Sequence, residues 1–333
     1  MRLRPQPPRR LRVTRSGWTL ALVAVGLGLA ALPTGNNLLY LLLGAVLGLI
    51  GLSGVLSEAV LRGVQVEREP VRAVAGRPAR VGYRVRNVHR RWPSYVLEIG
   101  ERDHPARAFV AYLAPGTATV ATLVRTWPRR GVVRLEELVV ATAFPFGLFV
   151  KELRFRAPQE VLVWPRYDRP LPRDAAAVAG HRPTPTAARA GRATRGEFRA
   201  LRDYRPGDDV RDVHWRSTAR RGRPVVREYD PEGEAPLWLG LWPGPDPERA
   251  EAAIELAASL AVHWLTRGRA VGLRLPHRTL PPAPGEAQRT ALLDALARLE
   301  LGASPPPPPP PGGGGLLVST AGPAPGWPAP LAP

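Results

Sequence analysis

The chain has 333 residues, with 47 lysines and arginines against 28 aspartates and glutamates, which gives a formal net charge of +19 at pH 7. Cysteine is absent, which excludes disulfide scaffolds, thiol catalysis, zinc fingers and iron–sulfur ligation. Lys151 is the only lysine, so the sequence contains neither a phosphate-binding loop that ends in G-K-[ST] nor an S-x-x-K acyl-enzyme motif.

The N-terminal part of the sequence predicts a membrane anchor. No charged residue lies between Arg15 and Glu58, a run of 42 residues. As one helix this run would be about 63 Å long, roughly twice the hydrocarbon thickness of a bilayer. A Pro-Thr-Gly-Asn-Asn turn cluster divides the run, so we expect a hairpin over 17–57 with transmembrane helices at about 17–32 and 38–56. A cleaved signal peptide is the alternative, and the second apolar run argues against it.

Arginines flank the outer ends of this hairpin but not its turn. The basic segment 1–16 contains Arg2, Arg4, Arg9, Arg10, Arg12 and Arg15. The second helix is followed by Arg62, Arg68 and Arg72. Because positive charge stays on the cytoplasmic side, we expect a multi-pass protein of the cell (inner) membrane whose N-terminus and soluble domains are cytoplasmic. Gly44, Gly48 and Gly51 are expected to form a close-packing seam against the first helix, unless glycine is simply frequent in such helices.

Residues 64–166 show the period-two alternation of β-strands. Val81, Tyr83 and Val85 alternate with arginines, and Gly- and Pro-containing turn signals separate one apolar stretch from the next. Seven or eight short strands in about 100 residues predict a β-sandwich of immunoglobulin-like size.

The pattern changes to alternating strands and helices over 236–320. An apolar run at 237–242 precedes a helix that opens with Asp-Pro-Glu at 246–248. A strand at 270–275, a second helix at 286–299 and a last strand at 316–319 follow. This order predicts an α/β domain with a parallel sheet.

A Pro/Gly-rich insert at 304–315 interrupts this α/β domain. Its run of prolines favours an extended polyproline II spacer that ends in a flexible glycine hinge. A ligand for a proline-recognition domain is the alternative, and the absence of closely flanking arginine or lysine argues against it. The tail at 321–333 is expected to be disordered.

The most distinctive stretch is the charged segment 196–230, which follows a linker at 167–195. Acids and arginines alternate here densely enough to pair, since arginine–carboxylate forks hold a fixed geometry. We expect a partner-recognition patch in this segment, unless its charges only pair internally. The candidate residues are Gly196, Phe198, Arg202, Tyr204, Pro206, Gly207, Asp208, Asp209, Arg211, His214, Trp215 and Arg220.

This segment resembles the signature of the bacterial YeaD-like proteins, the family called domain of unknown function 58. The family pattern G-x-E-F-x-x-L-R-x-Y-x-P-G-D-D-x-R is matched from its glutamate onward over 197–211, with Gly196 directly before the glutamate, Val213 in place of isoleucine and then Trp215, Ala219 and Arg220. The apolar stretch 34–58 and the run 144–149 are similar to further parts of the family, so the resemblance covers most of 15–300. It implies a membrane hairpin, a β-sandwich and a domain similar to von Willebrand factor A. The partners it implies are a MoxR-type AAA+ ATPase and a transglutaminase-like protein, and it implies no established activity.

The sequence departs from metal-binding von Willebrand A domains at one position. Those domains carry D-x-S-x-S after the first strand, where carboxylate and hydroxyl oxygens suit Mg²⁺. Here Gly240, Trp242 and Gly244 stand in that stretch, so we expect no metal there and no cofactor.

The residues that could carry chemistry are few. The histidines are scattered without metal-ligand spacing, and no G-x-S-x-G elbow is present. Asp208 and Asp209 can be read as a hydrolytic carboxylate pair, but a structural turn paired with local arginines is favoured. The sequence therefore predicts a non-enzymatic, membrane-anchored scaffold or adapter without catalytic residues. The alternatives are an arginine-rich protein that binds anionic lipid or nucleic acid, and a hydrolase; few aromatics accompany the arginines, which disfavours nucleic acid.

Overall fold

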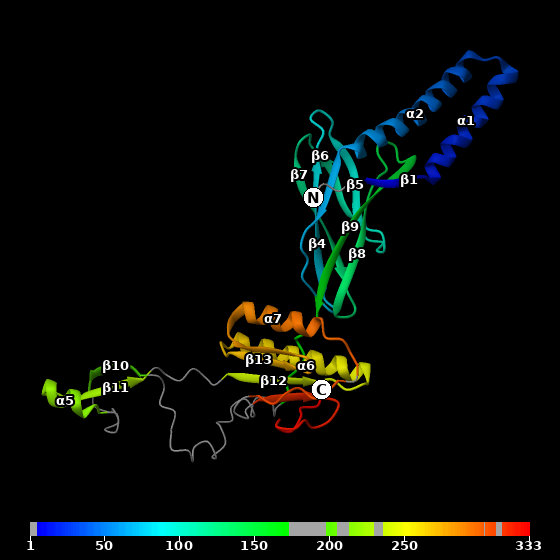
Figure 1. Ribbon diagram of the computed structural model, residues 1–333. Coiled ribbons are helices and arrows are strands. Elements are labelled where there is room, and N and C mark those ends of the chain that lie inside the picture. The colour runs from blue at the N-terminus through cyan, green and yellow to red at the C-terminus, as the bar shows by residue number, and fades with distance from the viewer. Residues whose placement is uncertain (1–4, 173–197, 205–212, 230–235, 303, 311–314) are drawn as a thin grey trace. The chain divides into compact units, whose positions relative to one another are not determined.

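The computed structural model describes residues 5–172, 198–204, 213–229, 236–302, 304–310 and 315–333. The chain divides into two compact units, Met1–Trp164 and Pro165–Pro333. Figure 1 shows their elements.

The N-terminal unit begins with a strand and two apolar helices, α1 (Arg15–Thr34) and α2 (Asn37–Arg62). Both are long and apolar enough to cross a membrane, and most of their surface is exposed rather than packed in a protein core. Gly35 between them has a left-handed backbone (φ 59°), which glycine adopts without strain. The α2 helix continues past the expected end at 56 because its last turns pack on the β-sheets, where Ser57 and Leu61 are buried.

The expected glycine seam on α2 is wrong. A Cβ placed on Gly44, Gly48 or Gly51 would meet nothing within 4 Å, so these glycines do not face α1. The small buried residues lie on α1 instead, at seven-residue intervals: Gly17, Ala24 and Ala31. Gly28 of α1 also approaches a Leu43 methyl of α2, 3.8 Å from where its Cβ would lie. At this contact, therefore, the first helix supplies the small residue and the second supplies the larger side chain.

The rest of the N-terminal unit is two β-sheets around one hydrophobic core. The strands are β1 (Pro5–Val13), β2 (Val64–Arg68), β3 (Ala73–Val74), β4 (Pro78–Asn87), β5 (Ser94–Glu101), β6 (Ala108–Leu113), β7 (Ala118–Thr126), β8 (Gly131–Thr142) and β9 (Phe149–Trp164). One sheet has the order β1-β9-β8-β5-β6, with β3 beside β9, and the other has the order β2-β4-β7. Tyr83, Leu97 and Phe155 are fully buried between them.

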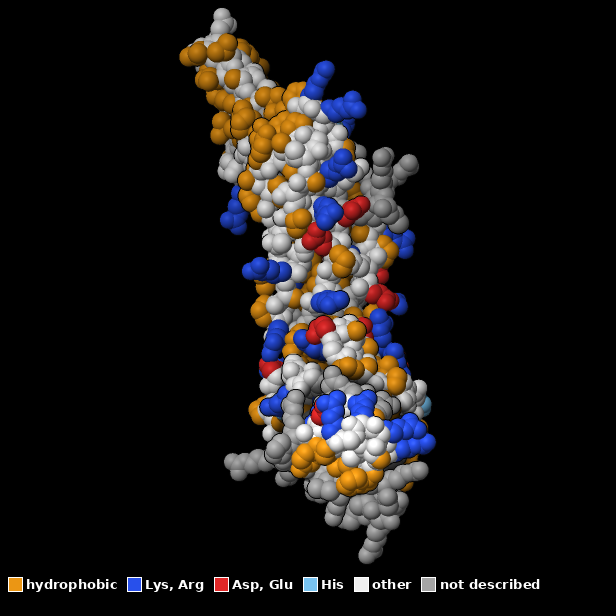
Figure 2. Space-filling view, turned by 90° about the vertical axis from the view of Figure 1, so that its left-hand side faces the viewer, with side chains coloured by type: hydrophobic (Ala, Val, Ile, Leu, Met, Phe, Trp, Pro, Cys, Tyr) orange, Lys and Arg blue, Asp and Glu red, His pale blue; other side chains and the backbone are white. Residues whose placement is uncertain are grey.

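The hairpin is bound to these sheets on both of its outer ends. Strand β1 runs directly into α1 and pairs antiparallel with β9, whereas α2 runs directly into β2 of the other sheet. The Thr14 hydroxyl accepts from the Gly17 amide, which caps α1, and donates to the Gly147 carbonyl at 2.6 Å. Lys151 on β9 donates to the Gly54 carbonyl of α2 at 2.6 Å. Figure 2 shows the apolar surface of the hairpin, with basic side chains beyond its base.

The C-terminal unit contains a four-stranded sheet with helices on one face (Figure 1). Its elements are β12 (Leu237–Trp242), α6 (Pro247–Thr266), β13 (Val271–Leu275), β14 (Arg278–Ala283), α7 (Gly285–Ala297) and β15 (Leu316–Ser319). The order is β14-β13-β12-β15, with β12 parallel to β13 and β15. The antiparallel strand β14 was not expected from the sequence. The unit also contains β10 (Phe198–Asp203), α5 (Trp215–Arg221) and β11 (Val225–Tyr229).

Two expectations for the C-terminal unit differ from the structure. The tail 321–333 is not disordered, because the Leu331 amide donates a hydrogen bond to the Leu317 carbonyl of β15 (2.7 Å). The proline segment is not a free spacer either, because Pro307 and Pro310 are buried. In both cases tryptophan side chains supply the contacts, as described below.

Candidate functional sites

The described part of the charged motif is a two-stranded ribbon crossed by a short helix. Strands β10 and β11 pair antiparallel, with Asp203 opposite Val225. Val213 bridges to Val226, and these two side chains are buried together with Val225. The described part of the connection, from Val213 onward, therefore lies against β11 and leads directly into α5.

His214, a predicted recognition residue, acts as the N-terminal cap of α5. Its Nδ1 accepts from the Ser217 amide at 3.2 Å and lies 2.7 Å from the Ser217 hydroxyl. Its own amide donates to the Val225 carbonyl at 2.8 Å. These contacts hold the start of the helix against β11, which is a structural role.

Trp215 and Arg220 differ from His214 because both are exposed. The Trp215 side chain is 67% exposed, which is unusual for a large aromatic, and Arg220 and Arg221 are exposed on the same short helix. Nearby, Arg223 pairs with Asp203 at 2.9 Å. An exposed indole and exposed guanidinium groups on one short helix have the composition of a protein-binding hot spot.

The other motif residues are located as follows. Arg202 lies on β10, and Tyr204 follows it, with its amide bonded to the Pro224 carbonyl at 3.0 Å. Phe198 begins β10. Gly196, Pro206, Gly207, Asp208, Asp209 and Arg211 lie outside the described residues. The proposed hydrolytic pair is among them, so its arrangement stays a prediction.

A comparison with protein families matches a region that includes most of the charged segment. Residues 200–314 match the family model described as Protein of unknown function DUF58. This part of the chain is a DUF58 region. The DUF58 match runs from β10 through α7, so the ribbon and most of the α/β sheet fall within one family region. A comparison with curated proteins found no match.

Within the DUF58 region, the stretch 240–244, for which the sequence predicts no metal site, is filled by protein. A Cβ on Gly240 would fall 2.7 Å from the Trp327 ring, so an aspartate could enter only if the ring moved. The Trp242 indole donates to the Ser304 carbonyl at 2.9 Å, and the Gly244 amide donates to the Thr320 hydroxyl at 2.7 Å. Among the described residues, no group of three acidic or histidine side chains is arranged to hold a metal.

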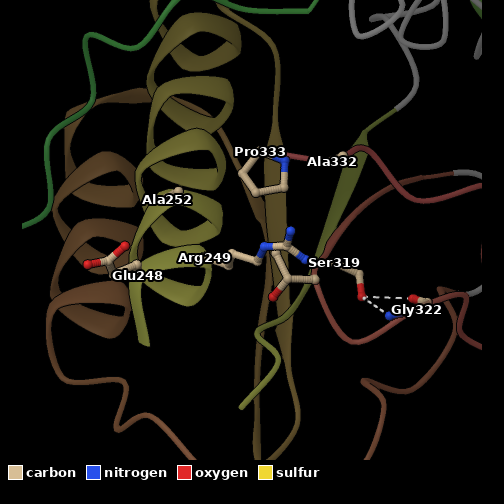
Figure 3. Close-up of a pocket in the computed structure, with 8 residues that line it drawn as sticks. Glu248, Arg249, Ala252, Ser319, Gly322, Ala332 and Pro333 are labelled. Carbon is tan, nitrogen blue, oxygen red and sulfur yellow. Dashed lines mark hydrogen bonds between the residues drawn. The ribbon is translucent and has the colours of Figure 1, made fainter. Parts of the chain in front are cut away.

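A pocket of about 560 Å³ lies where β15 ends and α6 begins (Figure 3). Arg249 extends from α6 toward Ser319, whereas Glu248 points away. The carboxyl ends of parallel strands are where α/β folds bind ligands. However, the Ser319 hydroxyl donates to the Gly322 carbonyl (2.7 Å) and accepts from the amides of Ala321 and Gly322, so it serves a local turn. This pocket therefore offers a cation but no nucleophile–base pair among its described lining residues.

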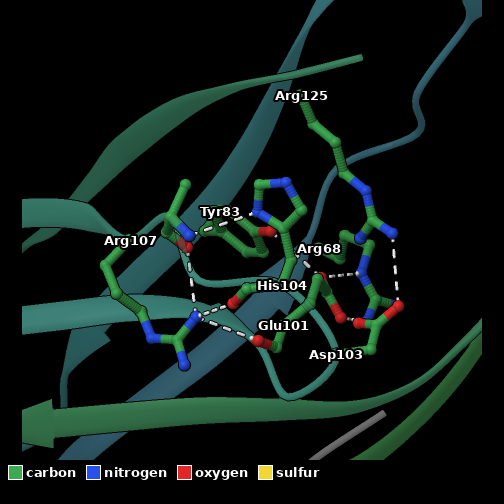
Figure 4. A network of polar contacts seen from close by, with 8 residues as sticks. Arg68, Tyr83, Glu101, Asp103, His104, Arg107 and Arg125 are labelled. Carbon is green, nitrogen blue, oxygen red and sulfur yellow. Dashed lines mark hydrogen bonds and ion pairs between the residues drawn. The ribbon is translucent and has the colours of Figure 1, made fainter. Parts of the chain in front are cut away.

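A buried cluster of polar side chains lies in the N-terminal unit (Figure 4). Arg68 and Glu101 form a two-pronged ion pair at 2.8 and 2.7 Å, and Tyr83 donates to the same carboxylate at 3.0 Å. Burial, followed by the charge and hydrogen bond of Glu101, raises the pKa of Tyr83. Because both ionic side chains are only 1% exposed, the cluster joins strands and does not receive substrate.

The sequence interpretation missed the tryptophans of the α/β sheet. Leu237, Leu239 and Leu241 are buried under the helices, so strand alternation places Trp238, Gly240 and Trp242 on the opposite face. The period-two pattern of leucine and tryptophan was the signal that could have revealed this surface.

Proposed function

We propose that the chain is a non-enzymatic adapter that is anchored in the membrane by the α1–α2 hairpin and recruits a partner protein to the membrane surface. The observation that carries this proposal is that strands on both sides of the hairpin are built into the sheets of the N-terminal unit. An anchor fused in this way holds the attached unit at the bilayer rather than on a loose tether. In this proposal the N-terminal sheets form an immunoglobulin-like sandwich and the α/β sheet is von Willebrand factor A-like.

The pairing of β1 with β9 supports the orientation. Strand β1 precedes the first helix and β9 follows the second, and backbone-paired strands must lie on one side of the bilayer. An even number of crossings follows, and the arginines around the hairpin favour the cytoplasmic side for both ends.

The recruiting surface in this proposal is α5, with its exposed Trp215, Arg220 and Arg221. Tryptophan and arginine are the residues that most often dominate binding energy, and this pair suits a partner with an acidic surface beside an apolar pocket. A MoxR-type AAA+ ATPase is the partner class that the family resemblance suggests, and a transglutaminase-like protein is a second one.

Cross-linking in native membranes, followed by affinity purification and mass spectrometry, tests the adapter. We expect an AAA+ ATPase with the unaltered chain, and its loss with Trp215→Ala or with a combined Arg220→Ala and Arg221→Ala variant. Arg129→Ala, an exposed arginine on a turn of the N-terminal unit, is the matched control and should not affect recovery. Reproducible substrate turnover by the purified chain would overturn the proposal.

Binding of anionic lipid is a second candidate, favoured by the loop between β4 and β5. Its Val88 amide donates to the Gly63 carbonyl at the end of α2 (2.8 Å), and the Ser94 hydroxyl donates to the Val60 carbonyl (3.1 Å). These bonds hold Arg90, Arg91 and Trp92 at the helix end, with Trp92 65% exposed. Arginine with tryptophan is typical of membrane–water interfaces.

Brominated lipids in nanodiscs test this second candidate. The fluorescence of Trp92 is obtained as the difference between the unaltered chain and a Trp92→Phe variant. Brominated phosphatidylglycerol should quench this difference more than brominated phosphatidylcholine does. The excess should disappear when Arg90 and Arg91 are both alanine. Equal quenching by the two lipids would reject an anionic-lipid site.

A further inference from the structure

The face of the α/β sheet opposite α6 and α7 is covered by a proline segment instead of helices. Parallel sheets are normally buried by helices on both faces. Here Trp242 of β12 and Trp327 of the tail contact residues 304–310, and Trp238 of β12 lies under Arg274, which also contacts that segment. We name this surface, together with Arg274 of β13, the tryptophan face.

The proline segment contacts the tryptophan face with a period of three. Pro307 and Pro310 are buried and Ser304 is half-buried, whereas Pro305, Pro306, Pro308 and Pro309 are exposed. A polyproline II helix has three residues per turn, so one of its three edges faces the tryptophans.

The two indole hydrogen bonds to the segment follow the same period, and a third bond reaches the neighbouring Pro308. The Trp242 indole donates to the Ser304 carbonyl at 2.9 Å, and the Trp327 indole donates to the Pro307 carbonyl at 3.0 Å. Arg274 lies over the Trp238 ring, 4.6 Å from its centroid, and donates to the Pro308 carbonyl at 3.3 Å. Prolines cannot donate backbone hydrogen bonds, so a surface that recognises them must supply donors together with aromatic faces, and this surface supplies both.

We propose that the tryptophan face is a binding site for proline-rich segments in the polyproline II conformation, and that residues 304–310 occupy it as an internal ligand. A proline-rich segment of another protein competes with the internal ligand for the site. This inference goes beyond the adapter function and does not depend on it. A tethered ligand has an effective concentration of about millimolar, so external peptides should bind the unaltered chain weakly.

The test uses the full chain in detergent micelles and a fluorescent peptide of the sequence Ser-Pro-Pro-Pro-Pro-Pro-Pro. In one variant a Gly/Ser sequence of equal length replaces Pro305–Pro310. We expect saturable binding to this variant, at least tenfold tighter than to the unaltered chain. Adding Trp242→Phe, which keeps the ring but removes the indole donor, should weaken that binding at least fivefold. Trp18→Phe on the hairpin is the control and should not change it.

A matched pair of single substitutions keeps the test decisive if the replacement variant unfolds. Pro307 is buried and Pro306 is exposed, so Pro307→Ala should increase affinity for the external peptide and Pro306→Ala should not. The inference is overturned if a folded replacement variant fails to bind millimolar peptide. It is also overturned if the replacement unfolds and folded Pro307→Ala binds peptide no better than Pro306→Ala, because the segment is then only part of the core.

Discussion

Arg68 and Glu101 meet side-on inside the N-terminal unit, where Nε and Nη2 of the arginine donate to the two carboxylate oxygens at 2.8 and 2.7 Å and both side chains are 1% exposed. Arg68 also donates to the Ala157 carbonyl at 2.9 Å, so the pair ties β2 of one sheet to β5 and β9 of the other. A charge left alone in such a place is costly, because neither water nor a partner compensates it.

Glu101→Gln should therefore destabilise the N-terminal unit by about 3–5 kcal/mol, measured by chemical unfolding. The matched control is Glu160→Gln, which breaks a pair with Arg134 at 3.3 Å that is more than half exposed. That control should cost at most about 1 kcal/mol. Similar losses in the two variants would contradict the structural role of the buried pair.

Because of Tyr83, the free energy of unfolding should decrease at alkaline pH. Its pKa is raised in the folded chain by burial and by Glu101, so above about pH 10 the unfolded chain releases a proton that the folded chain retains. The contribution of Tyr83 to the free energy of unfolding is complete below the pKa that this tyrosine has in the unfolded chain. Above that pKa the contribution decreases by up to about 1.4 kcal/mol per pH unit. Unfolding of the unaltered chain and of Tyr83→Phe from pH 8 to 11 should show the steeper decline only when the tyrosine is present. Parallel curves would contradict the shifted pKa.

Gly17→Ala should loosen the attachment of the hairpin. The Leu148 carbonyl lies so close to Gly17 that a Cβ has no room, and backbone cannot move as easily as a side chain. We expect a loss of about 1–3 kcal/mol, with faster proteolysis at the base of α1. Gly26→Ala on the same helix has nothing within 4 Å and should be neutral or slightly stabilising. The idea fails if both substitutions behave alike.

Gly240→Asp should not create a Mg²⁺ site. The new side chain would displace the Trp327 ring, so the melting temperature should fall, tryptophan fluorescence should change and added Mg²⁺ should have no effect. Gly302→Asp, in open space, is the control and should leave both readouts unchanged. Recovery of stability by Mg²⁺ would show that the position still supports metal binding.

Local sequence patterns predicted the apolar helices and the alternating strands. The charge-free run between Arg15 and Glu58 indicated two apolar helices, and alternation around Val81 indicated strands that the structure contains. Strand β1 could not be recognised, because its Pro- and Arg-rich sequence shows no alternation and its partner β9 lies far along the chain. Order in the tail likewise depends on Trp327 meeting Gly240, a contact between distant positions.

The candidate site was only partly predictable for a related reason. The composition of 196–230 drew attention to Trp215 and Arg220, which are exposed, but the same composition did not distinguish His214, which caps a helix. Whether a polar side chain faces solvent or a backbone amide is decided by the turn that it occupies.

The pairing of β1 with β9 also sets an order of events during synthesis. Residues 5–13 leave the ribosome long before residues 149–164, and at 5–20 residues per second the delay is roughly 7–30 seconds. Both helices are complete within that interval, so the hairpin can enter the bilayer while β1 still has no neighbour. Strand β1 must therefore wait at the membrane surface, and β9, when it is made, both closes the sheet and pairs with this earlier strand.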